Sequence, residues 1–146
     1  MANYQGGQAF ITSFTADADL TGAKQWTLVI PSSTAGNCQT AISGCSIMPV
    51  GILTNDPSAG QAAEVVVLGF TKAKARVGSS CWLSNGTLLK GASDAILEPV
   101  GNTDQPVLAR WLGARNTTAA ASILGNVLFL GGTAASGTGG QQGGGG

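Results

Sequence analysis

Short runs in which apolar and polar residues alternate follow one another along most of the chain. Residues 8–15 (QAFITSFT) and residues 25–30 (QWTLVI) both alternate with a period of two, and Pro31 ends the second run. A period of two places successive side chains on opposite faces of a β-strand. Both segments are therefore predicted to be strands.

Further strand-like runs occupy residues 47–53, 64–77, 94–100, 106–112 and 122–130, with turn-forming residues between them. Gly69 lies inside one run, where glycine indicates a bulge or a close approach of backbone. Asn85-Gly86 lies between residues 81–83 and 87–89, which predicts a hairpin with a two-residue turn. Eight to ten short strands at roughly ten-residue spacing indicate an all-β fold, a single small antiparallel β-sandwich or barrel domain.

The segment that follows Pro106 fits two patterns. Leu108, Trp111 and Leu112 fall at the i, i+3, i+4 spacing of a helix, whereas alternate positions from Val107 fit a strand equally well. Gly113 interrupts any long helical pattern. A strand is favoured, and the fold class leaves room for one short helix.

Three parts of the chain differ in composition. Residues 1–7 form a short N-terminal arm, residues 8–130 contain the predicted strands, and residues 131–146 hold 9 glycines among 16 residues without a large apolar side chain. A Gly-rich segment of this kind cannot bury enough apolar surface to offset its ordering entropy. We expect a β-rich domain followed by a flexible Gly-rich tail.

Charge is scarce and balanced, with 7 basic and 7 acidic residues among 146. Such a chain lacks the basic excess that nucleic-acid binding requires, so a nucleic-acid partner is not expected. No apolar run approaches the ~20 residues of a membrane-spanning helix, and the N-terminus lacks the pattern of a signal peptide. These features predict synthesis in the cytoplasm, no membrane partner, and contacts made through shape and apolar surface.

Catalytic and metal-binding patterns are weak. The chain has no histidine, which removes His-dependent triads and His metal ligands. Two carboxylate pairs remain, Asp17 with Asp19 and Asp56 with Glu64, and either pair could serve a hydrolase only if both acids faced one cleft. The shorter pair is read more simply as turn residues that hydrogen-bond the local backbone. We expect no enzyme activity, no cofactor and no metal.

Cys38, Cys45 and Cys81 are an odd number without C-x-x-C spacing, which does not indicate a disulfide framework. Burial as small apolar side chains is the simpler interpretation. A Cys38–Cys45 disulfide in an oxidising setting stays open.

Two groups of side chains are candidates for contacts with a partner. Lys72, Lys74 and Arg76 recur at a spacing of two, which puts them on one face of a strand. They are either a solvated face that protects the sheet from aggregation or a basic stripe that docks on an acidic protein surface. The three tryptophans, Trp26, Trp82 and Trp111, are expected in the core rather than at an interface, although aromatic residues also supply interface hot spots.

A series of short motifs runs through residues 47–130. They are Val50-Gly51-Ile52, Ala59-Gly60-Gln61, the apolar run from Val65 to Gly69, Lys72 with Lys74, the turn from Ser84 to Thr87, Val107 to Leu112, and Val127 to Leu130. In this order they resemble the small capsid cement, or head decoration, proteins of tailed bacteriophages.

The resemblance implies a β-rich module, commonly trimeric, that binds the outer surface of an assembled shell at threefold or quasi-threefold positions and reinforces it. Its partners would be the major capsid protein and further copies of itself, its place the outer surface of the virion, and it would use no cofactor. Contacts are expected from the arm (Ala2, Asn3, Tyr4, Gln5), from Lys72, Lys74 and Arg76, and from the Gly-rich tail. The alternative is a sugar- or receptor-binding β-module of a head fibre or tail adhesin, which an exposed Trp82 or Trp111 beside polar groups would favour.

Overall fold

The computed structural model describes residues 8–41, 48–78, 82–101, 106–118 and 122–133. Its strands are β1 (Ala9–Ala16), β2 (Leu28–Pro31), β3 (Asn37–Thr40), β4 (Gly51–Leu53), β5 (Ala62–Ala75), β6 (Leu88–Gly91), β7 (Leu97–Pro99), β8 (Val107–Trp111) and β9 (Ile123–Thr133). The helical element of the described residues is the short 3-10 turn η1 (Gly22–Lys24). The predicted all-β fold is confirmed.

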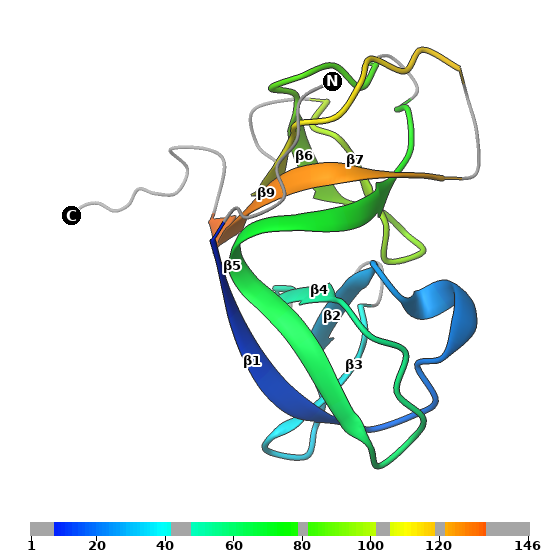
Figure 1. The fold of residues 1–146 in the computed structure, drawn as a ribbon, viewed down its shortest axis with the longest axis vertical. Coiled ribbons are helices and arrows are strands. Elements are labelled where there is room, and N and C mark those ends of the chain that lie inside the picture. The colour runs from blue at the N-terminus through cyan, green and yellow to red at the C-terminus, as the bar shows by residue number, and fades with distance from the viewer. Residues whose placement is uncertain (1–7, 42–47, 79–81, 102–105, 119–121, 134–146) are drawn as a thin grey trace, which may run out of the picture.

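The strands form one hydrogen-bonded sheet that closes on itself twice. Its order is β1-β3-β2-β4-β5-β7-β6-β8-β9, and the additional pairings β1–β5 and β5–β9 close two circuits. We call β1-β3-β2-β4-β5 the first ring and β5-β7-β6-β8-β9 the second ring. Most pairings are antiparallel, and the short β1–β3 and β5–β7 contacts are parallel. Figure 1 shows β5 as one curved ribbon that belongs to both rings.

Strand β5 changes partners at Gly69. Residues before Gly69 pair with β1, residues after it pair with β9, and Gly69 itself lies opposite both Ala9 and Phe129. Its φ is +113°, and a Cβ atom on it would lie 2.4 Å from the carbonyl oxygen of Gln8. Only glycine fits this conformation and this approach, because it has no Cβ. The predicted close approach of backbone at Gly69 is confirmed.

Each ring has its own cluster of buried side chains. The cluster of the first ring consists of small and medium residues: Ala16, Leu20, Val29, Cys38, Leu53, Ala63 and Val65. The cluster of the second ring contains the large aromatics Trp111 and Phe129. Leu28 of β2 and Ile52 of β4 pack into this second cluster, so the first ring also covers part of the core of the second.

The hairpin predicted around Asn85-Gly86 is wrong, although the turn forms. The amide of Thr87 donates to the carbonyl oxygen of Ser84 at 2.9 Å, as in a β-turn. The flanking runs do not pair with each other: Leu83 bridges to Asn116, and β6 pairs with β7 and β8. Leu83 and Leu89 are both buried in the second cluster, and reaching it takes the two runs to different neighbours.

Two other strands differ from the prediction, β2 in its first residue and β3 in being present at all, whereas β8 is as predicted. Strand β2 begins at Leu28 rather than at Gln25, because the chain turns through η1 and Trp26 has a positive φ of 68°. Strand β3 was not predicted, since its sequence NCQT is polar and Cys38 is its one buried residue. The strand favoured after Pro106 is confirmed as β8.

Candidate interaction surface

Part of the predicted contact set lies outside the described residues. This holds for Ala2, Asn3, Tyr4 and Gln5 of the arm and for the tail from residue 134. At the start of the described chain, Gln8 accepts a hydrogen bond from the amide of Phe70, and Phe129 of β9 lies opposite Gly69 of β5. The last residue of β9, Thr133, lies beyond this point and pairs with Val107 of β8. The start of β1 therefore lies beside Gly69 of β5, and Figure 1 shows the start of β1 and the end of β9 on the same side of the molecule.

The basic stripe follows the second half of β5 and the residue after it. The predicted alternation is present, since Ala73 and Ala75 are buried while Lys72 is exposed. The ammonium group of Lys74 donates to the carbonyl oxygen of Ala23 in η1, a contact that joins the two rings. Within the described residues, the ammonium group of Lys72 has no hydrogen-bond or ion-pair partner. Lys72 is thus the member of the stripe best placed to meet another molecule.

Arg76 belongs to an ion-pair network in the second ring. Its guanidinium lies 3.1 Å from the carboxylate of Asp94 and 3.1 Å from that of Glu98, which also contacts Lys90 at 3.3 Å. These side chains are partly exposed, so solvent screens their attraction. Two acids already balance the charge of Arg76, which leaves it less charge to offer a partner.

The loop between β4 and β5 is closed by its own amide groups. The side chain of Asn55 donates to the carbonyl oxygen of Ala62 at 3.0 Å and accepts from the amide of Glu64 at 2.9 Å. The amide of Leu20 donates to the carbonyl oxygen of Pro57, which ties the loop to the segment after β1. Asp56 and Glu64 are exposed. These hydrogen bonds hold the loop in place as a connection between β4 and β5.

The two members of the other carboxylate pair have different partners: Asp19 accepts hydrogen bonds within its own turn after β1, and Asp17 accepts one from β3. A carboxylate oxygen of Asp19 accepts from the amide of Thr21 at 3.1 Å and from its hydroxyl at 2.7 Å, as predicted for a turn residue. These hydrogen bonds lower the pKa of Asp19 from its usual value of 3.8, because they favour the charged form. Asp17 accepts from the side-chain amide of Asn37 at 2.9 Å.

Of the three cysteines, Cys38 is described and is a free, buried thiol in the cluster of the first ring. Burial raises the pKa of this thiol, and the charge of Asp17 adds to the shift. The predicted role of Cys38 as a small apolar side chain is confirmed. Cys45 and Cys81 lie outside the described residues.

Apolar side chains are exposed where β1 pairs with the middle of β5. Phe10 is 67% exposed, Ile11 is 60% exposed and Leu68 is 44% exposed. Phe10 and Leu68 are direct partners in the ladder, and the register shifts between Phe10 and Ile11. Because successive side chains of a strand point to opposite faces, Phe10 and Leu68 lie on one face of this ladder and Ile11 lies on the other. We call these three residues, which flank β1 on its two faces, the β1 patch. Phe10 and the partly buried Phe14 occupy equivalent positions in the alternating sequence pattern. Their different exposure therefore could not be predicted from the sequence.

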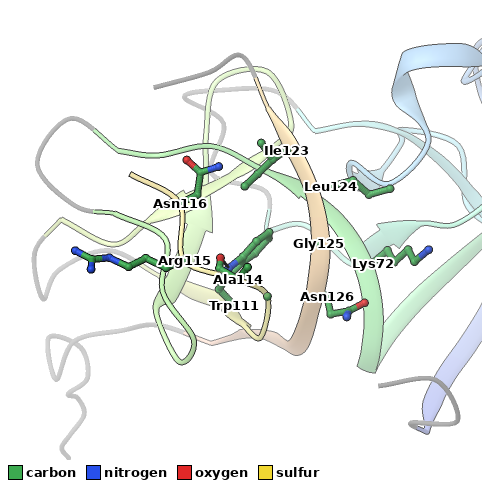
Figure 2. A pocket seen from close by; sticks show the side chains of 10 residues that line it. Lys72, Trp111, Ala114, Arg115, Asn116, Ile123, Leu124, Gly125 and Asn126 are labelled. Carbon is green, nitrogen blue, oxygen red and sulfur yellow. Dashed lines mark hydrogen bonds between the residues drawn. The ribbon is translucent and has the colours of Figure 1, made fainter. Parts of the chain in front are cut away.

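A surface hollow of about 340 Å³ lies between the end of β8 and the start of β9, and its base is the edge of Trp111. Figure 2 shows the side chains of Lys72 and Arg115 extending from it in opposite directions, so the cations do not converge on one ligand position. Trp111 is buried as predicted, and its Nε1 donates to the carbonyl oxygen of Ala114 at 2.9 Å.

The expectation of a core position is wrong for Trp82, which is 54% exposed. The guanidinium carbon of Arg115 lies 4.8 Å from the centre of its ring, in the range of a cation–π contact. Trp82 stands beside the hollow because its neighbour Leu83 bridges to Asn116. Sequence reasoning could not rank the three tryptophans, since each lies in an apolar run.

The described residues bring no three side chains of the metal-ligating types His, Cys, Asp and Glu together. Within the same residues, no helix has the length and hydrophobicity that a membrane crossing requires.

No protein-family model matches the sequence, and the search of curated proteins returned no match. Among solved structures, the fold is similar to that of the N base of the head fibre protein gp8.5 of bacteriophage phi29. The TM-score is 0.53 at 12% sequence identity, over 86% of this chain and 97% of that chain. The likeness concerns the fold and spans nearly all of the head-fibre base.

Proposed function

We propose that this chain is a structural protein of a bacteriophage head, bound to the outer surface of the assembled shell. The observation that carries the proposal is the likeness in fold to the N base of a head fibre, a match that covers 97% of that chain. The sequence motifs between residues 47 and 130 point the same way independently, through their resemblance to cement proteins of tailed phages.

In its finer form, the proposal is a cement protein that binds the major capsid protein as a homotrimer at threefold or quasi-threefold positions. It would be made in the host cytoplasm and carried on the virion. A trimer that touches several capsomers binds by multivalency, so each single contact can be weak. A chain with few and balanced charges suits contacts through apolar surface and strand edges. The proposal includes no catalytic step and no cofactor.

Purified protein added to shells that lack it tests the proposal. We expect saturable binding in co-sedimentation, and we expect decorated shells to keep their DNA at temperatures and chelator concentrations that empty bare shells. Protein that does not bind, or decorated shells that fail under the same conditions as bare ones, would contradict the cement role.

Charge reversal at Lys72 tests the predicted contact set. Lys72→Glu replaces the exposed cation of the stripe by an anion. We expect slower binding to shells, and we expect added salt to inhibit this binding less than it inhibits that of the wild type. Lys24→Glu is the matched control, because Lys24 is also exposed but lies in η1 of the first ring. Equal binding of the two variants would remove Lys72 from the contact.

A sugar- or receptor-binding module is the second candidate, and the exposure of Trp82 favours it. Sugars stack on aromatic faces, and Arg115 and Asn116 supply polar groups beside this ring. A glycan array probed with the wild type and with Trp82→Ala is the test, and Leu88→Ala is the control for loss of an exposed apolar side chain. Binding that only Trp82→Ala abolishes would support this function over a purely structural one.

A further inference from the structure

Strand β1 has an open edge next to its exposed apolar side chains. Its pairing with β3 is confined to Thr15 and Ala16, and within the described residues no strand lies beside the outer edge from Ala9 to Phe14. Hydrogen bonds alternate along an antiparallel strand. The amide of Ala16 donates to Gln61 of the loop before β5, and that of Thr15 donates to Gly36 on the other side. By this alternation the amides of Ile11 and Ser13 point outward.

This edge lacks the features that protect exposed strands. Natural edge strands carry charges, prolines or bulges that prevent pairing with another chain. The sequence of β1, AFITSFTA, contains neither a charge nor a proline, and the register shift with Phe10 and Ile11 places the extra residue on β5 rather than on β1. An edge of this kind, apolar on both sides, requires a partner strand or an apolar surface in the native assembly.

The chemistry of the edge favours a second copy of this chain. When identical surfaces meet at a symmetry axis, a charged side chain on the axis lies next to its own copy and repels it. The β1 patch carries no charge, whereas the second half of β5 exposes Lys72, which suits contact with a different molecule. The three side chains of the patch are 67%, 60% and 44% exposed, and they supply part of the roughly 800 Å² that each partner buries in a stable interface. Since they lie on the two faces of β1, an interface along the open strand edge would cover all three.

We infer that the β1 patch and the outer edge of β1 form the contact between copies of this chain. The inference rests on the proposed function, in which the protein acts as a homo-oligomer. It adds the surface: the patches of neighbouring copies meet at the axis of the oligomer.

The test compares the double variant Phe10→Asp/Ile11→Asp with Leu88→Asp/Leu124→Asp. Leu88 and Leu124 are 39% and 51% exposed but lie on strands of the second ring, so the control makes the same chemical change away from the patch. Sedimentation velocity over a dilution series gives the concentration at which each protein assembles. We expect the wild type and the control to assemble together, and the patch variant to need at least about tenfold more protein, a shift of one decade in Kd.

A second variant tests the edge itself. Ser13→Pro removes an amide that points outward and keeps the ladder to β5, since Ser13 does not donate to that strand in the alternation described above. We expect Ser13→Pro to assemble less well than the wild type while its urea midpoint at concentrations below assembly is preserved. The urea midpoint of every variant confirms that it is folded.

Four results would overturn the inference. The inference is overturned if the patch variant assembles at the same concentration as the wild type. It is also overturned if the control variant loses assembly as strongly as the patch variant does. If the wild type stays monomeric at all concentrations and the patch variant is less stable, another segment of the same chain covers the patch. If assembly is intact and only shell binding is lost, the patch faces the shell. Wild-type oligomers that the patch variant disrupts but that bind no shell would instead contradict the proposed function alone.

Discussion

The two rings that share β5 differ in how their strands bury aromatic side chains. The second ring encloses Trp111 and Phe129, both almost fully buried. The first ring encloses smaller residues and leaves Phe10 and Ile11 exposed on β1. The strands of the second ring therefore bury their aromatic side chains, whereas β1 of the first ring leaves Phe10 exposed next to Ile11.

The second ring accommodates Trp111 because glycines stand where the indole needs space. A Cβ atom on Gly125 would lie 2.1 Å from the ring of Trp111, and one on Gly113 would lie 2.8 Å from it. The indole N–H is satisfied by Ala114, so burial leaves no unpaired donor. Opposite Phe10 in the ladder of the first ring stands Leu68, which is itself 44% exposed.

Truncating one phenylalanine in each ring tests this contrast most directly. Phe129→Ala removes a buried ring and leaves a cavity, so we expect a loss of about 3–5 kcal/mol in the free energy of unfolding. Phe10→Ala removes an exposed ring and should change the same quantity by less than about 0.5 kcal/mol. Urea denaturation at concentrations below assembly measures both.

Equal losses for the two variants would mean that Phe10 is covered within the monomer, and the contrast between the rings would fail. At concentrations above assembly, Phe10→Ala should become destabilising as well, because burial between copies adds to stability by mass action. For Phe129→Ala, the loss in the free energy of unfolding relative to the wild type should be the same above and below the assembly concentration, provided that both proteins assemble equally.

The junction of the rings at Gly69 gives the next largest effect. Gly69→Ala forces a Cβ atom into the carbonyl group of Gln8 at a positive φ, and we expect a loss of about 1–3 kcal/mol. Gly86→Ala is the matched control, because Gly86 has a φ of +97° but no atom within 4 Å of its added Cβ. The difference between the two urea midpoints isolates the clash. Identical midpoints would show that the rings are not held together by this close approach.

The sequence predicted the elements that carry a strong local signal. The alternation of residues 8–15 and the apolar run that contains Gly69 correspond to β1 and β5, and the all-β class followed from the number of such runs. The pairing between strands could not be predicted in this way. Asn85-Gly86 forms its turn, yet the burial of Leu83 and Leu89 in one core outweighs the local preference for a hairpin. The double closure depends on β5 having partners on both sides along its length, which no local pattern encodes.

The surfaces were predictable only in part. Spacing alone placed Lys72 and Lys74 on one side of a strand, but it could not show that Lys74 reaches a carbonyl of η1 or that Arg76 meets two acids from distant segments. Phe10 and Trp82 look like core residues in the sequence, because exposure is decided by register and by the neighbours of each strand. Large side chains in apolar runs mark either a core or an interface, and only the fold distinguishes them.

The ion pairs of Arg76 provide a smaller effect that is confined to the second ring. Arg76→Met keeps much of the apolar stem and removes the contacts with Asp94 and Glu98. We expect a loss of up to about 1 kcal/mol at low salt, falling toward zero at about 1 M salt. Lys72→Met is the control and should have no measurable effect on urea midpoints at either salt concentration. A loss that salt does not reduce would mean that Arg76 acts through packing.

The smallest expected effect lies in the turn after β1 and depends on pH. Because the folded-state pKa of Asp19 is depressed by its hydrogen bonds from Thr21, its contribution to stability is present above the unfolded value of 3.8 and is lost as the pH falls through the folded value. Asp19→Asn keeps an oxygen acceptor but does not titrate. We therefore expect the stability difference between the wild type and Asp19→Asn to be constant well above pH 3.8 and to shrink as the pH falls below that value. Asp56→Asn, in the loop before β5, is the control. If Asp56→Asn shows the same pH-dependent difference in stability, the effect comes from net charge, and the ionised form of Asp19 does not stabilise the turn after β1.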